Sequence, residues 1–134
     1  MQGRDEITAS LETELRGSGE GILAAWLFGS VARDEAGPGS DVDVAVLLGR
    51  SPRSLAELPL DLEDHLERTL GLKVQVVALN EAPADLVHRV LLDGVLLLDR
   101  DPAARVRFEV QRRNEYFDLL PHLRRYRLLP EEAP

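Results

Sequence analysis

The residues best suited to chemistry lie between two apolar segments, in the stretch WLFGSVARDEAGPGSDVDVAVLL (residues 26–48). Gly29 and Ser30 end the first segment, and Asp41 and Asp43 open the second after ten intervening residues. Side chains two positions apart in a strand project from the same face of a sheet. We therefore expect the two carboxylates to share one patch, where they repel each other and where a divalent cation would relieve the repulsion.

Two neighbouring carboxylates suit Mg²⁺, which takes oxygen ligands and is usually held by one or two carboxylates together with substrate phosphates. Gly29 allows the backbone to approach such a ligand closely. A helical turn over Val31–Glu35 would offer backbone N–H groups to a phosphate, and the Ser30 hydroxyl and Arg33 guanidinium could each reach a phosphate oxygen. Ser40 is placed with these nucleotide-binding residues. The simpler alternative is an ordinary turn at Gly29, a turn-forming Ser40 and two exposed acids at a strand end.

The pattern GS-x10-DVD, with FGS at its start and an arginine three positions after the serine, resembles the signature of the polymerase-β-type nucleotidyltransferase superfamily. The later text LGLKVQVVALNEAPADLVHRVLLDGVLLLDRD resembles its minimal nucleotidyltransferase branch. This resemblance implies catalytic and metal-binding roles for Asp41 and Asp43, with Gly29 and Ser30 at the nucleoside triphosphate. It implies Mg²⁺-dependent transfer of AMP from ATP to an acceptor hydroxyl, with release of pyrophosphate.

The same resemblance implies a partner. Proteins of this branch commonly act as antitoxins that bind, and adenylylate, a HEPN-family ribonuclease toxin. The chain lacks the Arg-x4-6-His pattern of those ribonucleases, so it resembles the antitoxin. Two alternatives stay open: a catalytically weak antitoxin that neutralises its toxin by stoichiometric binding, and a small-molecule nucleotidyltransferase. The small-molecule alternative is less favoured, because this chain lacks the large additional domain that usually supplies an acceptor pocket in such enzymes.

One position departs from the superfamily pattern. Its third acid usually lies on the strand after the Asp-x-Asp strand, where this chain reads VQVV with Gln75. An amide oxygen can bind a metal, but it adds no negative charge and is a poor general base. Gln75 therefore predicts a weakened metal site and slower deprotonation of the attacking hydroxyl, unless it is simply a solvent-facing strand residue.

The elements that must position these residues alternate along the chain as α-β-α-β-α-β-α-β-α, which predicts an α/β (α+β) fold. The resemblance adds the polymerase-β-type nucleotidyltransferase fold, a small mixed sheet of three to four strands flanked by helices. We expect one domain over residues 1–134, with a core at about 1–99 and a helical extension at about 100–134. Strands are expected at Gly21–Phe28, Asp41–Leu48, Leu72–Leu79 and Val95–Leu98.

Two helices carry more specific expectations. A leucine stripe from Leu55 to Leu70 contains Pro59, which should delay or kink the helix. The acids of this helix, namely Asp61, Glu63, Asp64 and Glu67, are expected to be solvated. The last helix should begin with Asp101 as N-cap, carry Val106, Val110 and Phe117 on an apolar side, and end or bend at Pro121. Its aromatic residues, Tyr116, Phe117 and Tyr126, are either core residues or partner contacts.

Composition excludes several classes of protein. The 134 residues are 44% hydrophobic, contain no cysteine, and show neither a leader peptide nor an apolar run long enough for a membrane span, so we expect a cytoplasmic protein. A net charge of −8 disfavours nucleic acid as a partner. Eight arginines against four acids from Arg100 to Arg127 nevertheless form a basic segment. It is either a solvated helix face or a basic surface for an acidic partner or a nucleotide. A homo- or hetero-oligomer is compatible with the sequence.

Overall fold

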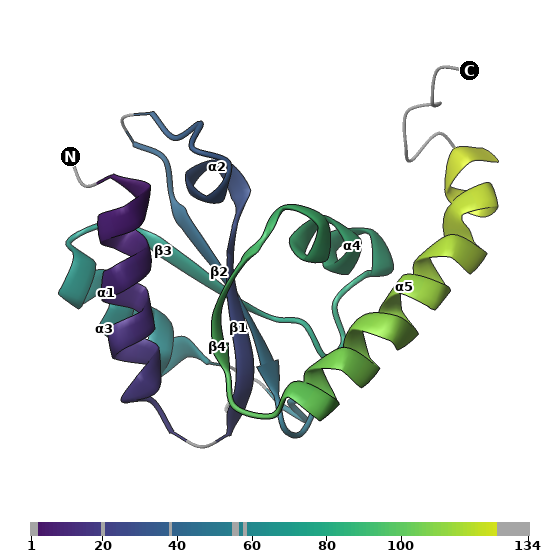
Figure 1. Cartoon of the computed structure of the whole chain (residues 1–134), viewed down its shortest axis with the longest axis horizontal. Helices are drawn as coiled ribbons and strands as arrows, with labels where there is room; N and C mark the ends of the chain where they lie inside the picture. Colours follow the sequence, from purple (N-terminus) through teal and green to yellow (C-terminus); the bar gives the residue numbers. More distant parts are fainter. Residues whose placement is uncertain (1–2, 20, 38, 55–56, 58, 126–134) are drawn as a thin grey trace.

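A four-stranded mixed sheet forms the centre of the computed structural model (Figure 1). The structure describes residues 3–19, 21–37, 39–54, 57 and 59–125. The strands lie in the order β3-β2-β1-β4, with β1 antiparallel to both β2 and β4, and β2 parallel to β3. They span Ile22–Phe28 (β1), Val42–Leu48 (β2), Val74–Ala78 (β3) and Val95–Asp99 (β4). The predicted mixed sheet and the predicted alternation of helices and strands are confirmed.

Helices cover both faces of this sheet (Figure 1). On one face lie α1 (Arg4–Arg16) and α3 (Leu60–Leu70), whose leucines pack into the larger of two buried clusters. On the other face lie α4 (Ala84–Asp93) and the first turns of α5 (Pro102–Arg125), which pack into the second cluster. The remaining helix, α2 (Gly29–Ala32), is a single turn at the end of β1.

The alternation of side chains along β2 decides which face carries the aspartates. Val42, Val44 and Val46 belong to the cluster under α1 and α3. Ala45 and Leu47 belong to the cluster under α4, with Trp26 of β1. Because successive strand residues point to opposite faces, Asp43 lies on the α4 face.

Helix α3 begins at Leu60, directly after Pro59, so the delayed start is confirmed; Leu55 and Leu58 lie outside the described residues. The prediction that its acids are only solvated was wrong for two of them. Glu63 accepts a hydrogen bond from the backbone N–H of Val76 (2.9 Å), and Glu67 accepts one from Val74 (3.2 Å). Since β3 is an edge strand, these carboxylates pair N–H groups that no neighbouring strand can reach.

Helix α5 begins as predicted but does not end at Pro121. Asp101 caps it as predicted, accepting a hydrogen bond from the Ala104 N–H at 3.1 Å. The helix continues through Pro121 to Arg125, because a proline removes one hydrogen-bond donor and need not stop a helix. Val106, Val110 and Phe117, which were predicted to form its apolar side, are exposed.

The side of α5 that packs on the domain instead carries Phe108 and Tyr116, together with arginines whose guanidinium groups are ion-paired. Arg105 pairs with Asp99 and with Glu109, at 3.0 Å each. Paired arginines can be covered because their aliphatic stems pack while their charges are satisfied. Within the described part of the chain, no helix is both long and apolar enough to cross a membrane.

Arg100, between β4 and α5, connects the C-terminal end of α1 to the sheet. Its guanidinium donates to backbone carbonyl groups at distances of 2.6–3.2 Å, namely those of Leu15, Arg16, Ser18, Gly19 and Ile22. The last carbonyls of a helix have no partner inside the helix, and a cation at that end also interacts favourably with the helix dipole.

We expect Arg100→Ala to lower the free energy of unfolding by about 2–3 kcal/mol, because several partly buried carbonyls lose a charged donor together. Urea denaturation would measure the change. The matched control is Arg68→Ala, which removes an exposed ion pair with Asp64 and should cost at most about 0.5 kcal/mol. Equal losses in the two variants would contradict the role assigned to Arg100.

Candidate functional site

The Gly-Ser turn lies where β1 meets α2, at one end of the sheet (Figure 1). The expected helical turn is present but begins two residues earlier than predicted, at Gly29. The buried side chains of Val31 and Ala32 anchor it to the cluster under α1 and α3. The turn is closed by the Glu35 N–H donating to the Ser30 carbonyl at 2.8 Å. The half-buried Ser30 is thus held at the rim of the sheet.

Gly29 is required for two independent reasons. Its φ of 78° lies in the left-handed region, which residues with a Cβ rarely adopt. A Cβ at this position would also clash with the Oδ2 atom of Asp43, and would lie 3.2 Å from the Asp43 Cγ. The close approach follows from the strand pairing, since Phe28 is the antiparallel partner of Asp43. The missing side chain therefore leaves room for a carboxylate of the chain itself.

Asp41 and Asp43 lie close enough to repel each other. Asp43 is in β2, and Asp41 precedes the strand by one residue; both are half-buried. Burial raises the pKa of the Asp43 carboxyl above its ordinary value, and the neighbouring charge of Asp41 raises it further. The guanidinium of Arg33 acts in the opposite direction and lowers that pKa. The structure thus brings together both predicted acids and the predicted arginine.

Arg33 and Ser40 also make contacts within the chain. The Arg33 side chain is ion-paired to Glu35 at 3.0 Å and is partly exposed. Sequence reasoning did not single out Glu35, because contacts between side chains inside a turn follow no regular period. The Ser40 hydroxyl oxygen accepts a hydrogen bond from the Gly37 N–H at 3.0 Å, the local turn contact that was the alternative expectation. Nucleotide binding by both residues stays a prediction.

Gln75 stands directly beside Asp43. The two residues are Cα partners in the parallel pairing of β2 with β3, so their side chains project from the same face. Gln75 is exposed, whereas Asp43 is half-buried. The position expected for a third acid is therefore next to the carboxylate pair, and an amide occupies it.

The residues of this site fit a divalent cation held jointly with a nucleotide. Two half-buried carboxylates repel each other, which is the situation that a bound cation relieves. Within the described ranges, no group of three or more His, Cys, Asp or Glu side chains could hold a metal ion. A metal with few protein ligands needs other oxygens, and Mg²⁺ commonly takes them from phosphates and water.

The raised pKa of Asp43 predicts how pH affects this site. In the folded protein the carboxyl keeps its proton to a higher pH than in the unfolded chain, where its ordinary value is 3.8. The charged form is the one that the fold disfavours, so stability of the metal-free protein should fall as pH rises from that value through the folded pKa. Because a cation needs the deprotonated carboxylate, its affinity should rise over the same interval.

Calorimetric titration with Mg²⁺ in buffers of different ionisation enthalpy would test this linkage. We expect protons to be released on binding at acid pH and fewer at neutral pH. Proton release that is absent at every pH would contradict it. Asp43→Asn serves as the control, since it should remove the release at acid pH.

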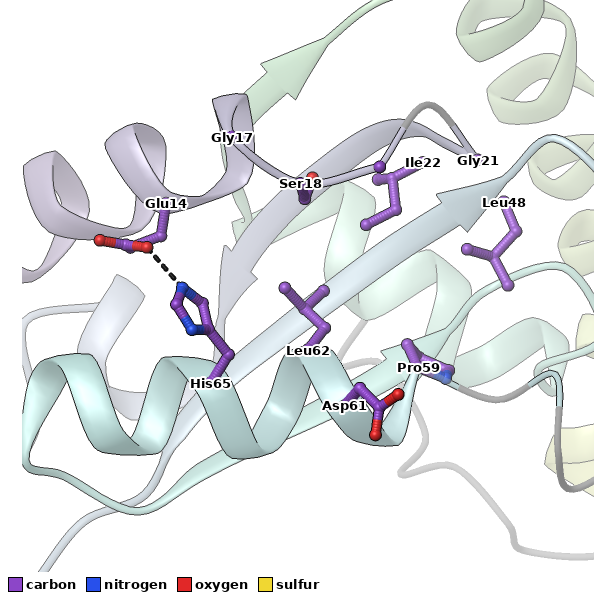
Figure 2. A pocket seen from close by; sticks show the side chains of 11 residues that line it. Glu14, Gly17, Ser18, Gly21, Ile22, Leu48, Pro59, Asp61, Leu62 and His65 are labelled. Atoms are coloured by element: carbon purple, nitrogen blue, oxygen red, sulfur yellow. Dashed lines mark hydrogen bonds and ion pairs between the residues drawn. The ribbon is translucent and has the colours of Figure 1, made fainter.

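A separate cavity of about 430 Å³ lies at the opposite end of β1 and β2, between α1 and α3 (Figure 2). Much of its lining is apolar, from Ile22, Leu48 and Leu62. On its rim His65 of α3 contacts Glu14 of α1 at 2.6 Å, an interaction that joins the two helices. None of the predicted site residues lines this cavity.

Comparison with known proteins agrees with the fold and the motif. Residues 10–103 match the family model described as polymerase beta, nucleotidyltransferase. A protein of Methanocaldococcus jannaschii, named as a protein adenylyltransferase, is 37% identical over 78 residues, which are 58% of this chain and 82% of that protein.

Solved structures of toxin–antitoxin complexes share the fold. One, described as a toxin-antitoxin with AMP-PNP, superposes with a TM-score of 0.75 at 24% identity, over 89% of this chain and 94% of the matched chain. A second, of a tri-AMPylated Shewanella oneidensis HEPN toxin with MNT antitoxin, has a TM-score of 0.71 at 22% identity, over 92% and 94%. With a family model that covers most of its length, the chain belongs to the polymerase beta nucleotidyltransferase family and is a nucleotidyltransferase.

Proposed function

We propose that this protein transfers AMP from ATP to a hydroxyl group of a partner protein, with Mg²⁺ held by Asp41 and Asp43. The observation that carries the proposal is the packing of Gly29 against the Asp43 carboxylate, beside the charge of Asp41. This contact unites the two halves of the motif, which are separated by ten residues in sequence.

The residues have distinct roles in this proposal. Asp41 and Asp43 are the catalytic, metal-binding residues, and Gly29, Ser30, Arg33 and Ser40 contact the triphosphate. A bound Mg²⁺ supplies positive charge against the phosphate oxygens. The acceptor oxygen forms a bond to the α-phosphorus while the bond from that phosphorus to the departing pyrophosphate breaks. The hydroxyl also loses its proton, which passes to solvent water because the amide of Gln75 cannot accept it.

The acceptor that we propose is a HEPN-family toxin protein, for which this chain is the antitoxin. Two similarities support it. The M. jannaschii relative is named as a protein adenylyltransferase, and solved structures with this fold are of HEPN toxin with MNT antitoxin, one of them with the toxin AMPylated. The structure with AMP-PNP supports an adenosine triphosphate as the donor.

A second candidate function rests on Gln75. Its position beside Asp43 leaves two carboxylates where the superfamily pattern has three acids. A protein with such a site would bind metal and nucleotide weakly and transfer slowly. In that case it would neutralise the toxin by stoichiometric binding.

Intact mass spectrometry separates the two candidates. A HEPN-family protein from the same genome is incubated with this protein, ATP and Mg²⁺, and with the variant carrying both Asp41→Asn and Asp43→Asn. The first candidate predicts a gain of one or more AMP units with the wild type and none with the variant. A stable complex without any gain in mass would contradict transfer and leave the binding function.

A further inference from the structure

An exposed apolar stripe runs along one side of α5. Val106, Val110 and Phe117 recur at spacings of four and seven residues, which places them on one side of the helix. Between 46% and 55% of each residue is exposed. Leu92 of the neighbouring helix α4 is 71% exposed. Apolar side chains that gather on one surface mark an interaction site more often than apolar residues scattered singly.

A hollow of about 90 Å³ lies between α4 and α5, lined by His88, Leu91, Leu92 and Arg113. Aromatic packing holds one of its walls in place. The His88 ring stacks on the buried Tyr116 with centroids 3.8 Å apart, and the Phe117 ring meets the His88 ring edge-on at 6.2 Å. The hollow is therefore preformed and large enough for part of one apolar side chain.

Arginines border the stripe and the hollow. At 100° per residue, Arg107 and Arg113 fall on either side of the line through Val106, Val110 and Phe117. Arg89 lies one turn before Leu92 on α4. These three arginines have no ion-pair partner in the part of the chain that the structure describes. Two acids lie here as well, Asp118 on the same side of the line as Arg107 and Asp93 next to Leu92. The three arginines exceed these acids by one, which leaves a net positive surface in a chain of net charge −8.

The charge pattern selects the occupant. Two copies of this chain that met through this surface would bring its unpaired arginines together, which is unfavourable. A helix with an apolar stripe bordered by Asp and Glu would instead pair with both the apolar residues and the arginines. Because α4 covers the sheet face that carries Asp43 and Gln75, a protein bound here lies on the same side as the carboxylates.

We propose that the surface formed by Leu92, Val106, Val110 and Phe117, with Arg89, Arg107 and Arg113 around it, docks the acceptor protein through an amphipathic helix bordered by acidic residues. This assignment rests on the proposed function for the statement that the acceptor is a protein. Helix α5 then positions the acceptor, while the Asp41–Asp43 site performs the transfer.

Affinity measurements with a purified HEPN-family protein from the same genome test the assignment. Val110→Asp combined with Phe117→Asp should weaken binding at least about tenfold, the effect of losing buried contacts near the centre of an interface. Arg107→Glu combined with Arg113→Glu should also weaken it and should make binding less sensitive to salt. Leu60→Asp, at a residue 58% exposed on α3, is the matched control and should bind like the wild type.

The outcomes separate docking from catalysis. Binding within twofold of the wild type for both surface variants would overturn the assignment. A wild type that forms no complex, or that self-associates through this surface, would overturn it too. If the Asp41→Asn, Asp43→Asn variant binds the partner normally and the wild type binds without adding AMP, the transfer function fails while the docking surface stands. Mg²⁺–ATP binding by the surface variants, expected to be unchanged, shows that their catalytic site is intact.

Discussion

Asp43→Asn is expected to reduce AMP transfer about a thousandfold, equivalent to about 4 kcal/mol of transition-state stabilisation. The residue lies against Gly29 and beside Asp41, where the change removes one of the two carboxylates available to a cation. An asparagine keeps the size of the side chain but loses its negative charge. The rate would be measured by release of pyrophosphate under single-turnover conditions, so that product dissociation does not limit it.

The same substitution should make the metal-free protein more stable. Burial and Asp41 both disfavour the charged form of Asp43, and a neutral amide removes this penalty. We expect a higher midpoint of thermal unfolding for Asp43→Asn without metal, and a smaller rise on adding Mg²⁺ than in the wild type.

Asp61→Asn is the matched control, because it makes the same change of charge on an exposed residue of α3, on the opposite face of the sheet. It should alter neither transfer nor metal binding. A rate for Asp43→Asn within tenfold of the wild type would contradict the assignment of Asp43 to the metal.

Gln75→Asp is expected to increase the rate of transfer by about a hundredfold, the lower end of what one positioned general base contributes. Gln75 is the Cα partner of Asp43 and its side chain lies on the same face, so the new carboxylate joins the existing pair. It adds both a charged metal ligand and a group able to accept the hydroxyl proton. The affinity for Mg²⁺ should rise in parallel.

The gain should have a cost in stability. A third carboxylate increases the repulsion around Asp43, so the metal-free variant should unfold at a lower temperature and recover when Mg²⁺ is added. Gln75→Glu, which keeps the length of the glutamine, distinguishes charge from geometry. Gln111→Asp on exposed α5 is the charge-matched control. An unchanged rate and an unchanged affinity in Gln75→Asp would place Gln75 outside the metal site.

The sequence by itself determined the residue types of the site and the order of the elements. Strand periodicity predicted that Asp41 and Asp43 lie at the start of one strand with the same parity, although the strand itself begins at Val42. The leucine spacing located α3. These predictions succeed because side-chain periods of 2 and 3.6 residues act within a single segment. The spacing of Gly29, Ser30 and the aspartates was sufficient to indicate the family that the comparisons confirm.

Only the tertiary structure decided how distant segments meet. The register of β2 with β3 sets Gln75 beside Asp43, and it depends on a crossover through α3. The contact of Gly29 with the Asp43 carboxylate depends on the pairing of β1 with β2. Likewise, the helix period finds the apolar residues of α5 but not the side that packs, because ion-paired Arg105 and Arg112 compete successfully for the inner side. Strand register and the packed side of a helix depend on contacts between distant segments, so the side-chain period within one segment does not predict them.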